Sequence, residues 1–459
     1  MPDSRGLMPR AALRGTAALS LLLAALAAAV AREPGKSAKG APDKAFAKVK
    51  REYQQKARNK KPAERLAALK LLEDYRTGDA ADLVYVTLLD DKTDSVRQAA
   101  IEFLADLRDD SEVMEKLVKR MISAGQKEGL DVKAVGALQA IAGGEDESLQ
   151  NRLIAYLDEM LGTQKADQAL LHAMIDHEAP KGDPAYVLRM LNLFSRTQFF
   201  DHDFGFRRCV VQGIMEVKDP DGLTQLIQLL PDLKGLVQFD AVTHLIAATG
   251  QNFGDNAAKW KAWWVENRGK NRTVDRSRPP PPSNYGNFGQ YYGIPICAKR
   301  VVFVLDTSLS MRGAKIDAAK TELVRAIREL PKEVFFDVIA FDNTARVWRP
   351  EPVPANEQNK IMAINVVMEQ PLKLKTASYD ALEAAFELHP EAIYFLSDGQ
   401  PMGGKIDDPK QIIATVSEAN RVRRVSIHSI GIATNESNVF ADFMKGLAEA
   451  NWGIYKPVN

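Results

Sequence analysis

The chain has 459 residues, of which 46% are hydrophobic and 26% are charged. Because a globular domain usually takes roughly 100 to 200 residues, this length favours two or three domains with ordinary apolar cores. The 61 Lys and Arg residues balance the 60 Asp and Glu residues, which leaves a formal net charge of +1. A chain without a strong net charge gives no electrostatic reason to expect nucleic acid or an anionic membrane as a partner.

The N-terminus has the pattern of a secretory signal peptide. Arginines precede an Ala- and Leu-rich run at residues 16–30, and Ala29-Val30-Ala31 matches the A-x-A cleavage pattern. The run is short for a membrane-spanning helix, and no later segment is apolar enough to span a bilayer. We therefore predict a signal peptide at 1–31, with an uncleaved anchor as the alternative, and a flexible leader at 32–44.

From residue 45 to residue 270 the pattern is helical and repeats itself. The segments 63–75 (AERLAALKLLEDY) and 95–107 (SVRQAAIEFLADL) align with each other, and looser copies begin at Asp131 and Phe206. Short helices that recur with a period of about 30 to 40 residues indicate a stacked α-solenoid. The V-R-x-A-A run at 96–100 makes the region resemble HEAT-like repeats, and this resemblance implies a solenoid over 45–270.

Two further features belong to this helical region. Trp260, Trp263 and Trp264 share one helix face, which predicts packing at the end of the array rather than ligand stacking. Cys209 and Cys297 are the only cysteines, and both lie in apolar surroundings typical of buried thiols. A disulfide between them is permitted in an exported protein, so their pairing stays open.

Residues 271–298 contain four consecutive prolines and many glycines, which favours an extended linker with few contacts across it. From 299 to 459 buried-type strands alternate with helices, which predicts an α/β domain with a doubly wound, mostly parallel sheet. The expected strands are 301–305, 335–341, 345–348, 392–396, 425–432 and 453–457, and the expected helices are 315–330, 359–369, 379–388, 409–421 and 439–449.

Two of these strands end in polar loops. Asp306, Ser308 and Ser310 follow the first strand, and Asp398 follows the fourth, so all four are expected at the carboxyl edge of the sheet, where open α/β sheets bind ligands. Alternate residues of an extended turn point the same way, so the two serines are expected to reach one ion. Together with Thr376, these oxygen donors suit Mg²⁺ or another hard divalent cation, Mn²⁺ or Ca²⁺.

Residues 299–459 resemble a von Willebrand factor type A domain, because D-x-S-x-S, the Thr and the Asp-Gly pair match its metal-ion-dependent adhesion site. The resemblance implies that the metal is bound by the hydroxyls of Ser308, Ser310 and Thr376 and anchored by Asp306 and Asp398.

Two departures from the family pattern concern this site. Leu309 stands where the family usually has Gly, and Lys375 and Ala377 flank Thr376 in place of Gly and Asn. The choice between Thr376 and Ser378 as the metal ligand therefore stays open.

Neutral hydroxyl ligands leave much of the ion's charge uncancelled, so an Asp or Glu carboxylate of a protein partner is expected to complete the shell. The sequence thus predicts a non-enzymatic binding protein of bacterial type, exported to the periplasm, the cell surface or the medium. A metal-free structural brace and a Mg²⁺-dependent hydrolase or phosphotransferase are the alternatives. The hydrolase lacks support from any G-x-S-x-G or P-loop motif. We make no prediction of the oligomeric state.

Overall fold

The computed structural model describes residues 44–107, 168–180, 182–269, 286–432 and 439–458, together with scattered positions between 110 and 161. The predicted signal peptide and leader, apart from Lys44, lie outside the described residues. The chain forms two compact units, Met1–Thr197 and Gln198–Asn459. Residues 198–270 of the predicted solenoid therefore belong to the same unit as the α/β domain. The prediction places the whole of 45–270 in one domain and 299–459 in another.

The first unit is helical in its described part. Arg65, at the repeated position of the first copy, forms a bidentate ion pair with Asp91, with Nε–Oδ2 2.7 Å and Nη2–Oδ1 2.8 Å. Arg97, at the equivalent position of the second copy, donates to the carbonyl of the same Asp91. The repeated arginines thus fix one inter-helix turn. The helices are α2 (Lys44–Ala57), α3 (Pro62–Lys70), α4 (Gly78–Thr87), α5 (Asp94–Asp106), α9 (Gln168–Glu178) and α10 (Pro184–Phe194).

The second unit begins with a further group of helices. Trp260 on the last of them is fully buried and donates Nε1–H to the Gly254 carbonyl, while Trp264 donates to the Thr224 hydroxyl. These contacts confirm packing for Trp260 and Trp264, whereas the HEAT solenoid whose end they are predicted to form remains a prediction. The helices are α11 (Gln198–His202), α12 (Phe204–Glu216), α13 (Pro220–Leu229), α14 (Gly235–Thr249) and α15 (Ala257–Asn267).

The mostly parallel sheet is confirmed. Its strand order is β5-β4-β3-β7-β8-β9, and β6 also pairs with β4. Neighbours among β3, β4, β7, β8 and β9 are parallel, whereas β5 and β6 run antiparallel to β4. The strands are β3 (Arg300–Asp306), β4 (Phe335–Phe341), β5 (Ala345–Val347), β6 (Val353–Pro354), β7 (Ala392–Ser397), β8 (Ser426–Ile432) and β9 (Tyr455–Val458).

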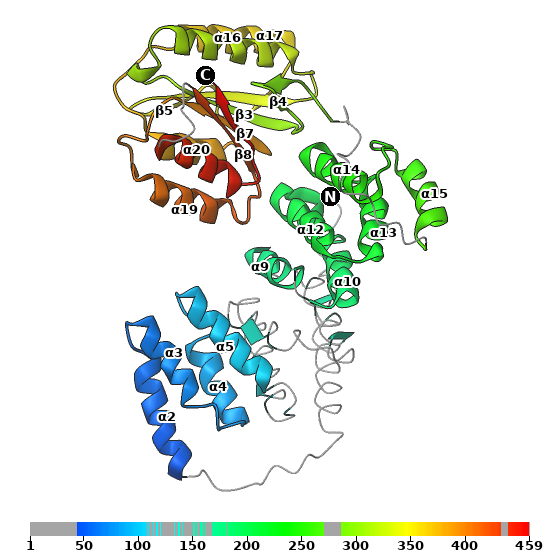
Figure 1. The fold of residues 1–459 in the computed structure, drawn as a ribbon, viewed down its shortest axis with the longest axis vertical. Helices are drawn as coiled ribbons and strands as arrows, with labels where there is room; N and C mark the ends of the chain where they lie inside the picture. The colour runs from blue at the N-terminus through cyan, green and yellow to red at the C-terminus, as the bar shows by residue number, and fades with distance from the viewer. Residues whose placement is uncertain are drawn as a thin grey trace, which may run out of the picture. The chain divides into compact units, whose positions relative to one another are not determined.

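Helices cover both faces of this sheet. Val301, Phe303 and Leu305 face one layer, and Val302 and Val304 face the other, as the period of two in a strand requires. One face is covered by α16 (Ala314–Glu329) and α17 (Glu357–Glu369), and the other by α18 (Ser378–Phe386), α19 (Pro409–Asn420) and α20 (Val439–Glu449) (Figure 1).

The end of the predicted linker is part of the domain core. Strands β1 (Gln290–Tyr291) and β2 (Ile294–Pro295) form an antiparallel hairpin. Tyr291 is buried against Phe303, with ring centroids 5.4 Å apart, and Tyr394 donates its hydroxyl to the Pro295 carbonyl. The linker prediction therefore fails for these residues, because the aromatic side chains pack onto the sheet. Residues 271–285 lie outside the described part.

Contacts also cross the predicted boundary between the helices and the sheet. Arg208 of α12 pairs with Asp240 of α14 at 2.8 Å and donates to the carbonyl of Arg424 beside β8. Glu391 accepts hydrogen bonds from the backbone N–H groups of Leu236 and Lys299. The expectation of few contacts is therefore wrong, because buried polar groups on both sides satisfy each other.

Cys209 and Cys297 are both buried thiols, and the structure shows no disulfide between them. Among the described residues, no helix is long and apolar enough to cross a membrane.

Candidate metal centre

The site lies where the sheet changes winding direction. From β3 the chain reaches β4 on one side, and β7 pairs on the other side, so the carboxyl ends of β3 and β7 flank a switch point. Open α/β sheets bind ligands at such points. Asp306 is the last residue of β3, and Ser397 is the last residue of β7. Sequence and topology thus bring the two polar loops to one place.

Asp306 is the buried anchor of the site. It is 0% exposed, its Oδ1 accepts the Ser308 N–H at 2.8 Å, and its Oδ2 accepts the Ser397 hydroxyl. Burial raises the pKa of Asp306 to about 6, and hydrogen bonds from Ser397 and Ser308 oppose this rise. A cation bound beside this carboxyl would stabilise its charged form and lower its pKa again.

The other predicted residues of the two loops form one chain of hydrogen bonds. The Ser308 and Ser310 hydroxyl oxygens lie 2.8 Å apart, and Ser310 donates to Asp398 Oδ1 at 2.7 Å. Residues Leu309–Met311 form a 3₁₀ turn, so the extended turn predicted for the serines is wrong. The turn still brings both hydroxyls together. Ser308 is buried and Ser310 is exposed, so this series of hydrogen bonds leads from the buried Asp306 to solvent.

Thr376 lies on a segment beside this chain. Its backbone pairs with Met402 in both directions, at 3.1 and 3.0 Å. The neighbouring Lys373 N–H donates to the Thr307 carbonyl, which attaches the segment to the loop of Ser308. Ser378 is fully buried, and its hydroxyl has no hydrogen-bond partner in the described part of the chain. Both candidate residues therefore lie on the segment that is bonded to the loop of Ser308, and the structure leaves the choice between their hydroxyls open.

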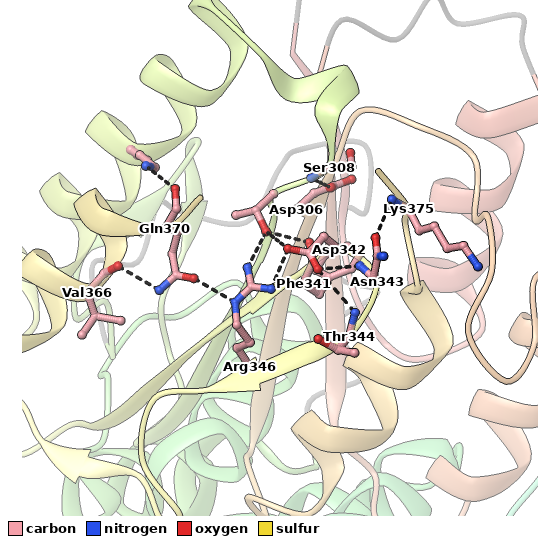
Figure 2. A network of polar contacts seen from close by, with 12 residues as sticks. Asp306, Ser308, Phe341, Asp342, Asn343, Thr344, Arg346, Val366, Gln370 and Lys375 are labelled. Atoms are coloured by element: carbon pink, nitrogen blue, oxygen red, sulfur yellow. Dashed lines mark hydrogen bonds and ion pairs between the residues drawn. The ribbon is translucent and has the colours of Figure 1, made fainter. Parts of the chain in front are cut away.

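A buried polar network behind the site was missed by the sequence reasoning (Figure 2). Asp342, which follows β4, is 0% exposed and accepts Arg346 Nη1 at 2.6 Å. Arg346 also donates to the Thr307 hydroxyl at 3.0 Å and to Gln370 Oε1 at 3.1 Å. The available signal was an acid directly after a buried strand with an arginine four residues later.

The same network also reaches the segment of Thr376. The Asp342 carbonyl accepts the Ala377 N–H at 2.8 Å. Asn343 Oδ1 accepts the Lys375 N–H at 3.0 Å (Figure 2). The turn after β4 thus contacts the backbone on both sides of Thr376. The turn therefore fixes the position of the Thr376 segment relative to the loop that carries Ser308.

The donor set fits a hard divalent cation. Within the residues that the structure describes, no group of three or more His, Cys, Asp or Glu side chains is placed to hold a metal. Asp306 and Asp398 contribute two carboxylates, and the remaining candidate donors are hydroxyls. Such an all-oxygen set suits Mg²⁺, Mn²⁺ or Ca²⁺ rather than zinc, which favours His and Cys.

Residues 299–456 match the family described as von Willebrand factor type A domain. The human (Homo sapiens) inter-alpha-trypsin inhibitor heavy chain H4 is 30% identical over 191 residues, which are 38% of this chain and 20% of that protein. The bovine (Bos taurus) heavy chain H4 is 31% identical over 159 residues, which are 32% of this chain and 17% of that protein. The chain spans about a fifth of the length of the curated relatives it matches.

Among solved structures, a von Willebrand factor type A protein from Catenulispora acidiphila aligns with a TM-score of 0.31 and 23% identity. The alignment covers 35% of this chain and 38% of that chain.

Proposed function

Because residues 299–456 form a von Willebrand factor type A domain, a general protein-interaction module, we propose that the chain is a binding protein that captures an acidic group of a protein partner through a divalent cation. The ion would be held by a hydroxyl of the 376–378 segment and by Asp306, Ser308, Ser310 and Asp398. Mg²⁺ is the favoured ion, with Mn²⁺ and Ca²⁺ as alternatives.

The observation that supports this proposal is the continuous chain of oxygen atoms from Ser308 through Ser310 to Asp398. The serine hydroxyls are neutral, so a bound cation keeps enough charge to attract a further carboxylate. Ser310 is exposed, which leaves room for that carboxylate to approach from solvent. When bound, the ion would supply the positive charge that an Asp or Glu side chain recognises.

The remaining parts of the proposed function concern the rest of the chain. The helical region would offer an extended surface to a partner, as stacked helical repeats do. The signal-peptide pattern at 1–31 supports export to the periplasm, the cell surface or the medium. We propose a binding rather than a catalytic role, since no nucleophile and base motif accompanies Asp306.

A metal-free structural brace is the second candidate. It is favoured by the contacts that α12 and α14 make with the base of the sheet through Arg208 and Glu391. It is also favoured by the closed hydrogen-bond network of the site, which satisfies both carboxylates without an ion. The two candidates differ in a measurable property, the binding of a divalent cation.

Thermal melts of the whole chain with Mg²⁺, Mn²⁺ or Ca²⁺ test the proposal. Metal at about 100 times its dissociation constant should stabilise the folded state by about 2.7 kcal/mol. Asp398→Asn should abolish this stabilisation. Asp407→Asn removes an exposed charge from the same segment between β7 and α19 and should retain the stabilisation. If none of the three ions shifts the melting temperature of the wild type, the metal-binding proposal fails and the metal-free structural brace replaces it.

A further inference from the structure

Lys315 reaches into the site from the first turn of α16. Its Nζ lies 2.6 Å from Asp398 Oδ2. The side chain of Asp398 is 0% exposed, whereas that of Lys315 is 36% exposed. The ion pair therefore joins a buried carboxylate to an ammonium group that has one side in solvent. A lysine stem has four flexible carbons, so this ammonium can leave the site without a movement of the helix.

All four carboxylate oxygens of the site are engaged by groups of the protein. Asp306 accepts from the Ser308 N–H and the Ser397 hydroxyl. Asp398 accepts from the Ser310 hydroxyl on one oxygen and from Lys315 on the other. Of these four donors, only Lys315 carries a full positive charge. It therefore occupies the electrostatic role that a metal ion would take beside Asp398.

We propose that Lys315 is a tethered counter-ion that competes with the divalent cation for Asp398, an inference that rests on the proposed metal-dependent function. A lone pair that accepts the ammonium is not free to face a metal ion, and two cations beside one carboxylate repel each other. Metal binding therefore requires Lys315 to leave Asp398 for solvent.

This arrangement has two consequences. Without metal, Lys315 neutralises a carboxylate that would otherwise be buried and unpaired, so the loops keep their conformation. With metal, part of the binding free energy is spent on breaking the Lys315–Asp398 pair, so the apparent affinity is lower than the oxygen ligands alone would give. The lysine thus sets the cation concentration at which the site fills.

The test compares Lys315→Met with Lys373→Met in the whole chain. Lys373 is exposed on the segment beside Ser308, so its substitution removes a charge near the site without removing the Asp398 pair. Titration calorimetry with Mn²⁺ should show an affinity about tenfold higher for Lys315→Met and nearly unchanged for Lys373→Met. Lys315→Arg keeps the charge and should remain near the wild type. The melting temperature without metal should fall for Lys315→Met only.

The possible results separate the inference from the proposed function. If the wild type binds Mn²⁺ and Lys315→Met binds it equally well, the inference is wrong and the metal site stands. If Lys315→Met binds Mn²⁺ tightly and the wild type binds it only weakly, competition by Lys315 is supported in its strongest form. If no variant binds Mn²⁺, Mg²⁺ or Ca²⁺, both fail. Should Lys315→Met be insoluble, Lys315→Gln, which removes the charge and keeps a polar side chain, serves the same comparison.

Discussion

Arg346, which is partly exposed, forms an ion pair with the buried Asp342 directly behind the loop that carries Ser308. Arg346 Nη1 lies 2.6 Å from Asp342 Oδ2, and the carboxylate side chain is 0% exposed. The same guanidinium donates to the Thr307 hydroxyl, one residue before Ser308. The pair therefore supports the position of a candidate ligand without being a ligand itself.

The first prediction concerns this ion pair. Arg346→Met should lower the free energy of unfolding by about 3 to 5 kcal/mol, because it leaves a buried carboxylate without its charged partner. Gln370→Leu removes only the uncharged partner of Arg346 and should cost about 1 kcal/mol. Urea denaturation of both variants measures the difference. Equal losses in the two variants would mean that the charge of Arg346 is not what stabilises Asp342.

The second prediction concerns Asp337 in the middle of β4. This residue is 0% exposed, and its Oδ2 has no hydrogen-bond partner in the described part of the chain. Burial raises the pKa of Asp337 to about 7, although hydrogen bonds from backbone N–H groups, with that of Val338 the largest, oppose the rise. Between about pH 4, the value of a free Asp, and pH 7, the folded state therefore binds more protons than the unfolded state.

The contribution of Asp337 to stability is thus largest below pH 4 and is lost as the pH rises through 7. Asp337→Asn cannot ionise, so the variant should lose less stability than the wild type between pH 5 and pH 8. Urea denaturation at pH 5 and pH 8 measures the change in the free energy of unfolding for both proteins. The difference between the two changes reports on Asp337, because the other titrating groups contribute equally to both proteins. A wild-type and a variant curve with the same pH slope would show that Asp337 is already charged in the fold.

The third prediction concerns the contact between the helices and the sheet. Glu391 at the base of β7 accepts the N–H of Leu236 at the start of α14, at 3.1 Å. A fragment of residues 198–459 keeps this contact, whereas a fragment of 286–459 loses it together with the Arg208 interactions. The longer fragment should melt at a higher temperature, as circular dichroism would measure. Identical melting temperatures would mean that the sheet domain is energetically independent of these helices.

Several elements of the second unit could be predicted from sequence because their signals are local. The buried run after residue 300 and the alternation of strands and helices give the parallel sheet, and the helix at Val439–Glu449 matches its predicted bounds. The β1–β2 hairpin was missed because its Gly-rich sequence resembles a linker. Its role depends on packing between Tyr291 and Phe303, which no local pattern contains.

The residues of the candidate site also include some that the sequence predicts and others that only the fold reveals. Asp306 and Asp398 could be predicted because each directly follows a buried strand and belongs to a recognisable motif. Asp342 also directly follows a buried strand, but it belongs to no recognised motif, and its role with Arg346 arises from contacts with Thr307 and with the segment of Thr376. Lys315 is one of many helical lysines in sequence, and only the fold brings it to Asp398.

The last prediction addresses the ligand that sequence and structure leave open. Thr376→Val and Ser378→Ala each remove one hydroxyl with little change of shape, and both residues are buried on the segment bonded to the loop of Ser308. We expect Thr376→Val to weaken Mg²⁺ binding at least about tenfold, because its segment is bonded to the loop of Ser308. Ser378→Ala should leave Mg²⁺ affinity nearly unchanged.

The two substitutions should also differ in stability without metal. The Ser378 hydroxyl is buried without a partner among the described residues, and such a group costs about 1 to 3 kcal/mol. Ser378→Ala should therefore raise the melting temperature or leave it unchanged. Titration calorimetry and thermal melts of both variants provide the two measurements. A loss of Mg²⁺ affinity in Ser378→Ala, with Thr376→Val unaffected, would assign the metal ligand to Ser378 and explain why its hydroxyl is kept free.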